Sequence, residues 1–198
     1  MSANSVDLKR RRMLVTATSV VAAVGAGFAA VPFLASWGPS AKAKAAGAPA
    51  EADISKLEPG QMLRVKWRGK PVWVVRRTES NLSDLASLDG LLADPDSQSD
   101  QQPEYCRNAA RSLKPEYLIA IGICTHLGCS PTYRPEVGAD DLGGAEWKGG
   151  FFCPCHGSRF DLAGRVYAGV PAPTNLVVPP HQYVSDTQIL IGVDGGAS

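Results

Sequence analysis

The stretch CTHLGC at positions 124–129 is followed, after residues 130–152, by the stretch CPCHGS at positions 153–158. Together they hold four of the five cysteines and two of the three histidines in a chain of 198 residues. Each combines thiols and an imidazole with a glycine, the residue that best tolerates tight turns. Cys and His side chains bind soft and borderline metals. The two stretches therefore predict a metal site formed by two loops.

Two kinds of metal site are compatible with these residues. Cys and His together form the tetrahedral zinc sites of many small domains. A Cys-x-His pair combined with a Cys-x-x-His pair is instead typical of a Rieske 2Fe–2S centre, in which two histidines replace two cysteines on one iron. In this sequence the pairs are Cys124 with His126 and Cys153 with His156.

The pattern resembles the Rieske iron–sulfur proteins of cytochrome bc complexes. The resemblance extends to an amino-terminal anchor, a hinge and the stretch GVPAP at positions 169–173. It implies a single Rieske 2Fe–2S cluster as the cofactor, with two Cys and two His as metal ligands. By this resemblance Cys124 and Cys153 bind one iron, and His126 and His156 bind the other.

The resemblance also assigns roles to neighbouring residues. Cys129 and Cys155 correspond to the pair that forms a disulfide between the loops, and Ser158 to a serine that donates a hydrogen bond to the cluster. Leu127 is expected to cover the cluster and to contact the quinone pocket, with simple loop packing as the alternative. High-potential members of the family have a tyrosine donor where this chain has Phe160. We therefore expect a lower midpoint potential than in members that have both donors.

The implied function is that of the iron–sulfur electron-transfer subunit of a membrane quinol–cytochrome c oxidoreductase, an enzyme that contributes to proton translocation. Quinol, expected to be ubiquinol, gives one electron to the cluster at the quinol-oxidation site of the cytochrome b subunit. His126 and His156 are the expected catalytic residues, with His156 as the expected proton acceptor. The electron passes to a membrane-bound c-type cytochrome of the same complex, which is expected to be dimeric.

Two other functions remain open. The small Rieske subunit of an arsenite oxidase shares the export signal and the disulfide pair, although a retained anchor and the GVPAP stretch argue against it. A zinc-stabilised binding module without a redox role is the alternative from another class. Cys106 and His181 match neither ligand pattern. We expect Cys106 to be a passive apolar residue and His181 to be a surface or packing residue.

The amino-terminal region contains a predicted membrane anchor. No charged residue occurs between Arg12 and Lys42, and residues 13–37 are rich in Ala and Val. A helix over this segment is about 37 Å long, which exceeds a hydrocarbon core of roughly 30 Å. A cleavable signal peptide is the alternative, but its apolar region is usually only about 7–15 residues long.

Three basic residues, Arg10, Arg11 and Arg12, precede this segment. They resemble a twin-arginine export signal, whose machinery would then be a partner; an ordinary cluster of cytoplasmic positive charge is the alternative. Residues 1–12 are expected in the cytoplasm, with the anchor crossing the lipid of the bacterial inner membrane and the remaining chain in the periplasm. The twin-arginine pathway exports folded proteins, which suits a domain whose cofactor is inserted in the cytoplasm.

Composition divides the rest of the chain into a linker and a domain. Residues 38–52 are small and rich in Ala and Gly, so we expect a flexible hinge linker, with a helical extension as the alternative. Residues 1–50 hold six Lys or Arg and one Asp, which leaves 14 basic and 18 acidic residues for the remainder. The net charge of +1 gives no reason to expect nucleic-acid binding.

Residues 53–198 are predicted to form a Rieske-type, mainly β domain of antiparallel strands, with a small cluster-binding subdomain at about residues 123–160. Alternating apolar residues around a turn predict a β-hairpin. Leucines at spacings of three and four predict a short amphipathic helix. The expected strands cover residues 62–67, 72–75, 117–123, 176–178, 182–184 and 189–193, and the expected helix covers residues 80–92.

Overall fold

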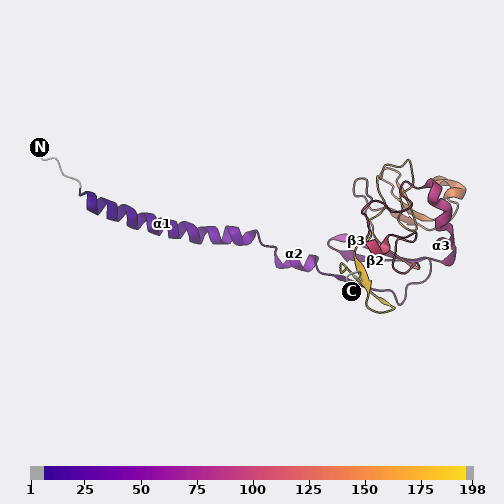
Figure 1. The fold of residues 1–198 in the computed structure, drawn as a ribbon, viewed down its shortest axis with the longest axis horizontal. Helices are drawn as coiled ribbons and strands as arrows, with labels where there is room; N and C mark the ends of the chain where they lie inside the picture. The colour runs from indigo at the N-terminus through magenta and orange to yellow at the C-terminus, as the bar shows by residue number, and fades with distance from the viewer. Residues whose placement is uncertain (1–6, 195–198) are drawn as a thin grey trace. The chain divides into compact units, whose positions relative to one another are not determined.

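In the computed structural model, which describes residues 7–194, the chain forms two units that divide after Ala45. The first unit is helical, and the β-strands of the described residues all belong to the second (Figure 1). Every strand pairing in the second unit is antiparallel. The predicted architecture, one apolar helix followed by an antiparallel β domain, is confirmed.

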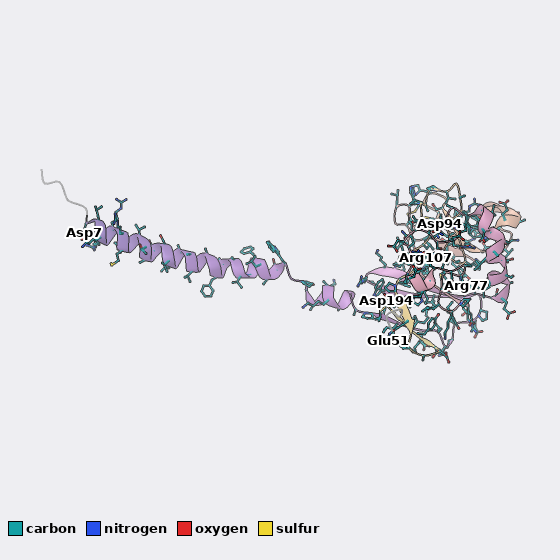
Figure 2. All side chains as sticks on the ribbon, in the orientation of Figure 1. Asp7, Glu51, Arg77, Asp94, Arg107 and Asp194 are labelled. Atoms are coloured by element: carbon teal, nitrogen blue, oxygen red, sulfur yellow. A yellow bond between two sulfur atoms is a disulfide. The ribbon has the colours of Figure 1, made fainter. Side chains whose placement is uncertain are left out.

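Helix α1 (Leu8–Ser36) corresponds to the predicted membrane anchor. Asp7 caps its start by accepting hydrogen bonds from the backbone N–H groups of Lys9 and Arg10 at 3.0 and 3.2 Å (Figure 2). A carboxylate at this position also interacts favourably with the helix dipole. The helix is about 44 Å long at ~1.5 Å per residue, and it is long and apolar enough to cross a membrane. The three arginines before the apolar segment lie inside the helix.

The predicted linker, residues 38–52, contains two short elements. Helix α2 (Ala41–Ala46) matches the helical alternative for this segment. Strand β1 (Ala50–Asp53) begins inside the expected linker and places Ala50 opposite Ile191. Alanine is depleted in strands, so it is the pairing with the neighbouring strand that recruits these residues. The expectation of a linker is therefore wrong for residues 50–52.

Two three-stranded sheets, ordered β1-β9-β8 and β2-β3-β4, share one apolar core. They consist of β1, β2 (Met62–Trp67), β3 (Lys70–Arg76), β4 (Tyr117–Ile121), β8 (His181–Tyr183) and β9 (Gln188–Ile191). Fully buried side chains such as Val72, Val74 and Ile189 contribute to this core. The pairing of β2 with β3 confirms the predicted hairpin.

The sequence predicts two metal loops, residues 124–129 and 153–158. A third sheet, ordered β5-β6-β7, carries the second of these metal loops. It consists of β5 (Thr132–Arg134), β6 (Gly150–Phe152) and β7 (Arg159–Asp161). Trp73 of β3 stacks on Phe151 of β6, with ring centroids 4.8 Å apart and an interplanar angle of 16°. A side-chain carbon at Gly122 would collide with the Trp73 indole. This close packing fixes the end of β4, from which the first metal loop departs.

The connection between β3 and β4, residues 77–116, is called the strap below. Its helix α3 (Glu79–Leu85) starts at a capping box formed by Thr78 and Asn81. The predicted helix over residues 80–92 ends at Leu85, and the chain continues as a 3₁₀-helix, η1 (Ala86–Leu91). The remaining 3₁₀ turns are η2 (Glu104–Cys106), η3 (Asp140–Leu142) and η4 (Gly144–Glu146).

The strand predicted over residues 176–178 is wrong. The backbone there makes one hydrogen bond to each of three different segments. The Leu176 N–H donates to the Gly164 carbonyl at 2.8 Å, the Ile121 N–H donates to the Val177 carbonyl at 2.7 Å, and the Val178 N–H donates to the Gln101 carbonyl at 2.8 Å. Two prolines follow directly, and proline cannot donate to a strand ladder. The apolar side chains of this segment fill the core without forming a strand.

Candidate metal centre

The two metal loops, residues 124–129 and 153–158, have the same backbone arrangement. In the first loop the Cys124 N–H donates to the Cys129 carbonyl at 2.7 Å. In the second loop the Cys153 N–H donates to the Ser158 carbonyl at 2.8 Å, five residues on as in the first. Each loop is thereby closed on itself by a hydrogen bond between its first and sixth residues.

A glycine at the fifth position permits this shape. The Gly128 N–H donates to the Cys124 carbonyl at 3.1 Å, and the Gly157 N–H donates to the Cys153 carbonyl at 2.9 Å. Gly128 and Gly157 have φ angles of +86° and +79°, in the left-handed region that favours glycine. The glycines recognised in both motifs are thus needed for backbone conformation.

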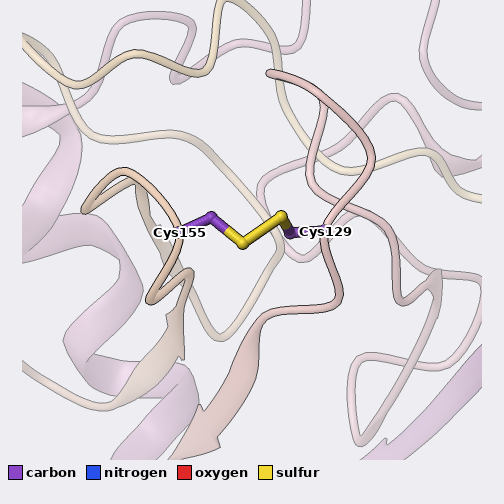
Figure 3. The surroundings of a disulfide bond; sticks show 2 residues. All are labelled: Cys129 and Cys155. Carbon is purple, nitrogen blue, oxygen red and sulfur yellow. A yellow bond between two sulfur atoms is a disulfide. The ribbon is translucent and has the colours of Figure 1, made fainter.

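A disulfide between Cys129 and Cys155 ties the two loops together, with an S–S distance of 2.07 Å (Figure 3). The pairing that the family resemblance implies is confirmed. The disulfide joins the sixth residue of the first loop to the third residue of the second loop, so the first cysteine of each loop remains unbridged.

Those first cysteines, Cys124 and Cys153, are each only 2% exposed. The Cys153 sulfur lies within 4.8 Å of both disulfide sulfurs. Burial raises the pKa of the Cys124 thiol, and the Cys153 thiol raises it further, while contacts with the His126 N–H and the Ser158 hydroxyl lower it. Metals bind the thiolate form of cysteine. A cation bound by Cys124 and Cys153 would therefore offset the free energy needed to ionise these two buried thiols.

The two loop histidines lie against one another. The ring of His126 meets the ring of His156 edge-on, with centroids 4.7 Å apart and an interplanar angle of 86°. His156 is exposed, whereas His126 is partly buried. The Nδ1 atom of His126 is buried without a hydrogen-bond partner among residues 7–194. A buried ring nitrogen of this kind fits a metal ligand, because an unpaired buried acceptor is otherwise costly.

Together, the two unbridged thiols and the unpaired imidazole nitrogen fit a metal cluster held by two Cys and two His. Leu127, which follows His126 in the first loop, is 72% exposed. Its exposure beside the histidine pair gives the site an apolar outer face.

A third segment, residues 169–176, contacts both loops and is called the proline stretch below. The Ala172 N–H donates to Ser158 Oγ at 3.0 Å. The Thr125 hydroxyl donates to the Thr174 carbonyl at 2.7 Å. The prolines of this stretch stand out in the sequence, whereas Thr125, between Cys124 and His126, has no chemical signal of its own.

The remaining residues that the sequence analysis singled out lie away from the loops' outer face. Phe160 is fully buried on β7, in the apolar core that also contains Cys124 and Cys153. Cys106 is fully buried in η2, and burial raises the pKa of its thiol to about 11, as expected for an inert thiol. His181 is fully buried, which fits the packing role and not the surface role expected for it.

Two family models match the chain. A model described as "Rieske [2Fe-2S] domain" matches residues 49–181. A second, described as "Ubiquitinol-cytochrome C reductase Fe-S subunit TAT signal", matches residues 1–40, which include the three export arginines and α1. The matches and the Cys–His loops define a Rieske [2Fe-2S] protein with a twin-arginine signal.

Two relatives in sequence narrow this class. The "Ubiquinol-cytochrome c reductase iron-sulfur subunit" of Allochromatium vinosum is 70% identical over 198 residues, covering 100% of this chain and 95% of the relative. The Bradyrhizobium diazoefficiens protein of the same name is 43% identical over 192 residues, covering 96% of this chain and 99% of the relative. A solved structure described as "Hyperthermophilic respiratory Complex III" is 25% identical with a TM-score of 0.49, covering 90% of this chain and 98% of that chain. The chain belongs to the family of ubiquinol–cytochrome c reductase iron–sulfur subunits.

Proposed function

We propose that this chain carries single electrons from quinol to a c-type cytochrome, using a 2Fe–2S cluster held by Cys124, Cys153, His126 and His156. The observation that carries the proposal is the arrangement of the loops. Two loops joined by a disulfide hold two buried, unbridged thiols and a pair of imidazole rings that meet edge-on. Two thiols and two imidazoles are the donor set of a Rieske centre, whereas an all-cysteine site has no imidazole donor.

A Rieske cluster, when bound, accepts one electron at roughly −150 to +300 mV, a range that quinols can reach. The protein's own contribution is to hold and move a proton beside it. Imidazole titrates near neutral pH, so a ligand histidine can take up a quinol proton at its outer nitrogen. His156 is the more exposed ring and is the proposed acceptor, with His126 beside it. The exposed Leu127 excludes water and contacts the apolar quinone pocket.

Ser158 supports the same site through its hydroxyl. Its Oγ accepts the Ala172 N–H, so its own hydrogen is free to point elsewhere. Ser158 lowers the pKa of the Cys124 thiol, which is the effect of a hydroxyl that donates toward that sulfur. A hydrogen bond to sulfur stabilises the more negative, reduced form and raises the potential.

The partners follow from this role. The cytochrome b subunit supplies the quinol-oxidation site, with ubiquinol as the quinol, and a membrane-bound c-type cytochrome of the same dimeric complex accepts the electron. The linker between α1 and β1 permits the domain to move between them. Residues 1–12 lie in the cytoplasm, the apolar segment 13–37 crosses the inner membrane, and the β domain lies in the periplasm after twin-arginine export.

The test is to purify the full chain from membranes, record the EPR spectrum of the reduced sample and measure b-type and c-type haem. We expect a Rieske spectrum and co-purification of both haems. Cys153→Ala should abolish the spectrum, whereas Cys106→Ala, which removes another buried unbridged thiol, should retain it. A silent spectrum with stoichiometric zinc would refute the proposal.

A further inference from the structure

Arg111, in the strap, is a fully buried cation. Its Nη2 donates to Gln102 Oε1 and to the Leu176 carbonyl, each at 2.8 Å. Its Nη1 donates to the carbonyls of Ala163 and Gly164 at 3.1 and 3.2 Å. All four acceptors are uncharged. The φ angle of Arg111 is +49°, a conformation that costs energy for a residue with a side chain. A strained and desolvated cation at this place requires an explanation.

The contact with Leu176 connects Arg111 to the proline stretch. The Leu176 N–H donates to the Gly164 carbonyl at 2.8 Å, and Arg111 bonds that same carbonyl and the Leu176 carbonyl. The guanidinium therefore connects two segments: the turn after β7, residues 162–164, and the end of the proline stretch at Leu176. Its planar set of donors suits this double contact, which a lysine cannot reproduce.

The proline stretch in turn holds groups of both metal loops. It supplies the N–H of Ala172 to Ser158 and the carbonyl of Thr174 to Thr125, as described above. The Ser158 Oγ has one lone pair occupied by this N–H, and this contact limits the directions in which its hydroxyl hydrogen can point. A shift of the stretch would therefore turn the hydroxyl away from the Cys124 sulfur.

A purely structural role is the competing interpretation, and Arg77 provides the comparison. Arg77 is 2% exposed, and it also donates to uncharged acceptors of the strap and of the turn after β7. Within the described part of the chain, none of its hydrogen bonds reaches residues 169–176. The two arginines therefore share burial and charge but differ in their contact with the proline stretch.

We propose that Arg111 is a positioning residue: it fixes the proline stretch and, through Ala172, orients the Ser158 hydroxyl toward the metal centre. This inference rests on the proposed function, because it concerns the cluster that the loops would hold. It predicts that the midpoint potential depends on a side chain that lies outside both metal loops.

The experiment compares Arg111→Lys with Arg77→Lys in the purified full chain. Lysine keeps the positive charge, so a change in potential reports geometry and not the loss of a charge. We expect Arg111→Lys to lower the midpoint and to speed hydrogen exchange of the Ala172 amide. Arg77→Lys should leave both quantities at their wild-type values. Equal changes in the two variants would assign Arg111 a general structural role and overturn the inference.

A double-mutant cycle with Ser158→Ala tests the route. If Arg111 acts through the Ser158 hydroxyl, Arg111→Lys should shift the midpoint much less in the Ser158→Ala background than in the wild type. The same shift in both backgrounds would overturn the inference. Should Arg111→Lys fail to fold, Gln102→Leu loosens the guanidinium without removing it. A folded Gln102→Leu variant with unchanged midpoint and unchanged Ala172 exchange would overturn the inference as well.

The amide measurement separates this inference from the proposed function. Exchange at Ala172 reports its hydrogen bond to Ser158 whatever metal the protein holds. A wild-type sample without a Rieske spectrum would defeat the proposed function, while accelerated exchange in Arg111→Lys alone would still support the positioning role.

Discussion

Phe160 lies directly opposite Phe151 in the antiparallel pair β6–β7, and both rings are fully buried in the core that contains Cys124 and Cys153. Directly opposite residues share one face of a sheet. The Phe160 ring is thus held in a dry environment close to the metal loops, where a polar atom would have a large electrostatic effect.

Introducing a hydroxyl by Phe160→Tyr should raise the midpoint potential. A hydrogen bond that forms in the reduced state contributes about 0.5–1.5 kcal/mol, which corresponds to roughly 20–65 mV for one electron. Redox titration of the purified protein measures the shift. Phe151→Tyr places a hydroxyl in the same core against Trp73 and should not raise the potential. An unchanged midpoint in Phe160→Tyr would contradict the prediction.

Removing the disulfide by the double substitution Cys129→Ser, Cys155→Ser should reduce the free energy of unfolding. The two cysteines are 26 residues apart in sequence, and a closed loop of that size is worth roughly 3.5 kcal/mol through the entropy of the unfolded chain. Denaturant unfolding of the oxidised wild type and the variant measures the difference. Reduced wild type is the control and should match the variant. Equal stability of oxidised wild type and variant would show that the bond does not constrain the unfolded chain.

Gly122→Ala should destabilise the domain by ~1–3 kcal/mol, because the new methyl group meets the Trp73 indole and overpacks the core. The same displacement should reduce the occupancy of the metal site, since the first loop begins two residues later. Gly90→Ala is the matched control, because a methyl group at that position would have open space around it, with no described atom of another segment within 4 Å. Stability equal to that of the control would refute this packing argument.

Stability should fall in acid because of His181. Its Nδ1 lies 2.9 Å from the Pro179 carbonyl, and because a carbonyl oxygen can only accept, Nδ1 carries a proton. Burial lowers its pKa below the ordinary value of 6.5. The unfolded chain therefore binds the proton first, and stability declines as the pH falls below about 6.5, with a slope of up to ~1.4 kcal/mol per pH unit.

The variant His181→Asn isolates this effect, because its Nδ2 keeps the donor to Pro179 but does not titrate. Denaturant unfolding at a series of pH values between the ordinary pKa and mild acid should show a shallower slope in the variant. Identical slopes would show that the acid sensitivity does not come from His181.

The metal centre was largely predictable from sequence because its geometry is local. Each loop is shaped by hydrogen bonds between residues four or five positions apart, and the glycines that these bonds require are visible in the motif. The loop glycines could thus be identified from two six-residue stretches, and the disulfide followed from the family resemblance; the ligand pairs and the role of Ser158 stay predictions.

Contacts between distant segments were not predictable in the same way. Arg111 bonds Leu176 across 65 residues, and nothing in the strap sequence distinguishes it from an exposed arginine such as Arg107. The same limit explains two differences between the predicted and the observed secondary structure. The alanine-rich end of the linker becomes strand β1 because it pairs with β9. In the strap, the regular leucine pattern forms an α-helix of only seven residues.

The hydrogen bonds that shape the two loops join atoms of the chain alone. The conformational entropy of the loops, about 1–2 kcal/mol per residue, is therefore lost when the domain folds and not when metal is captured. On the proposed export route, folding and cluster insertion take place in the cytoplasm, where thiols stay reduced. During that interval, backbone hydrogen bonds hold each of the two loops in shape. On this route the disulfide between Cys129 and Cys155 forms only after export to the oxidising compartment.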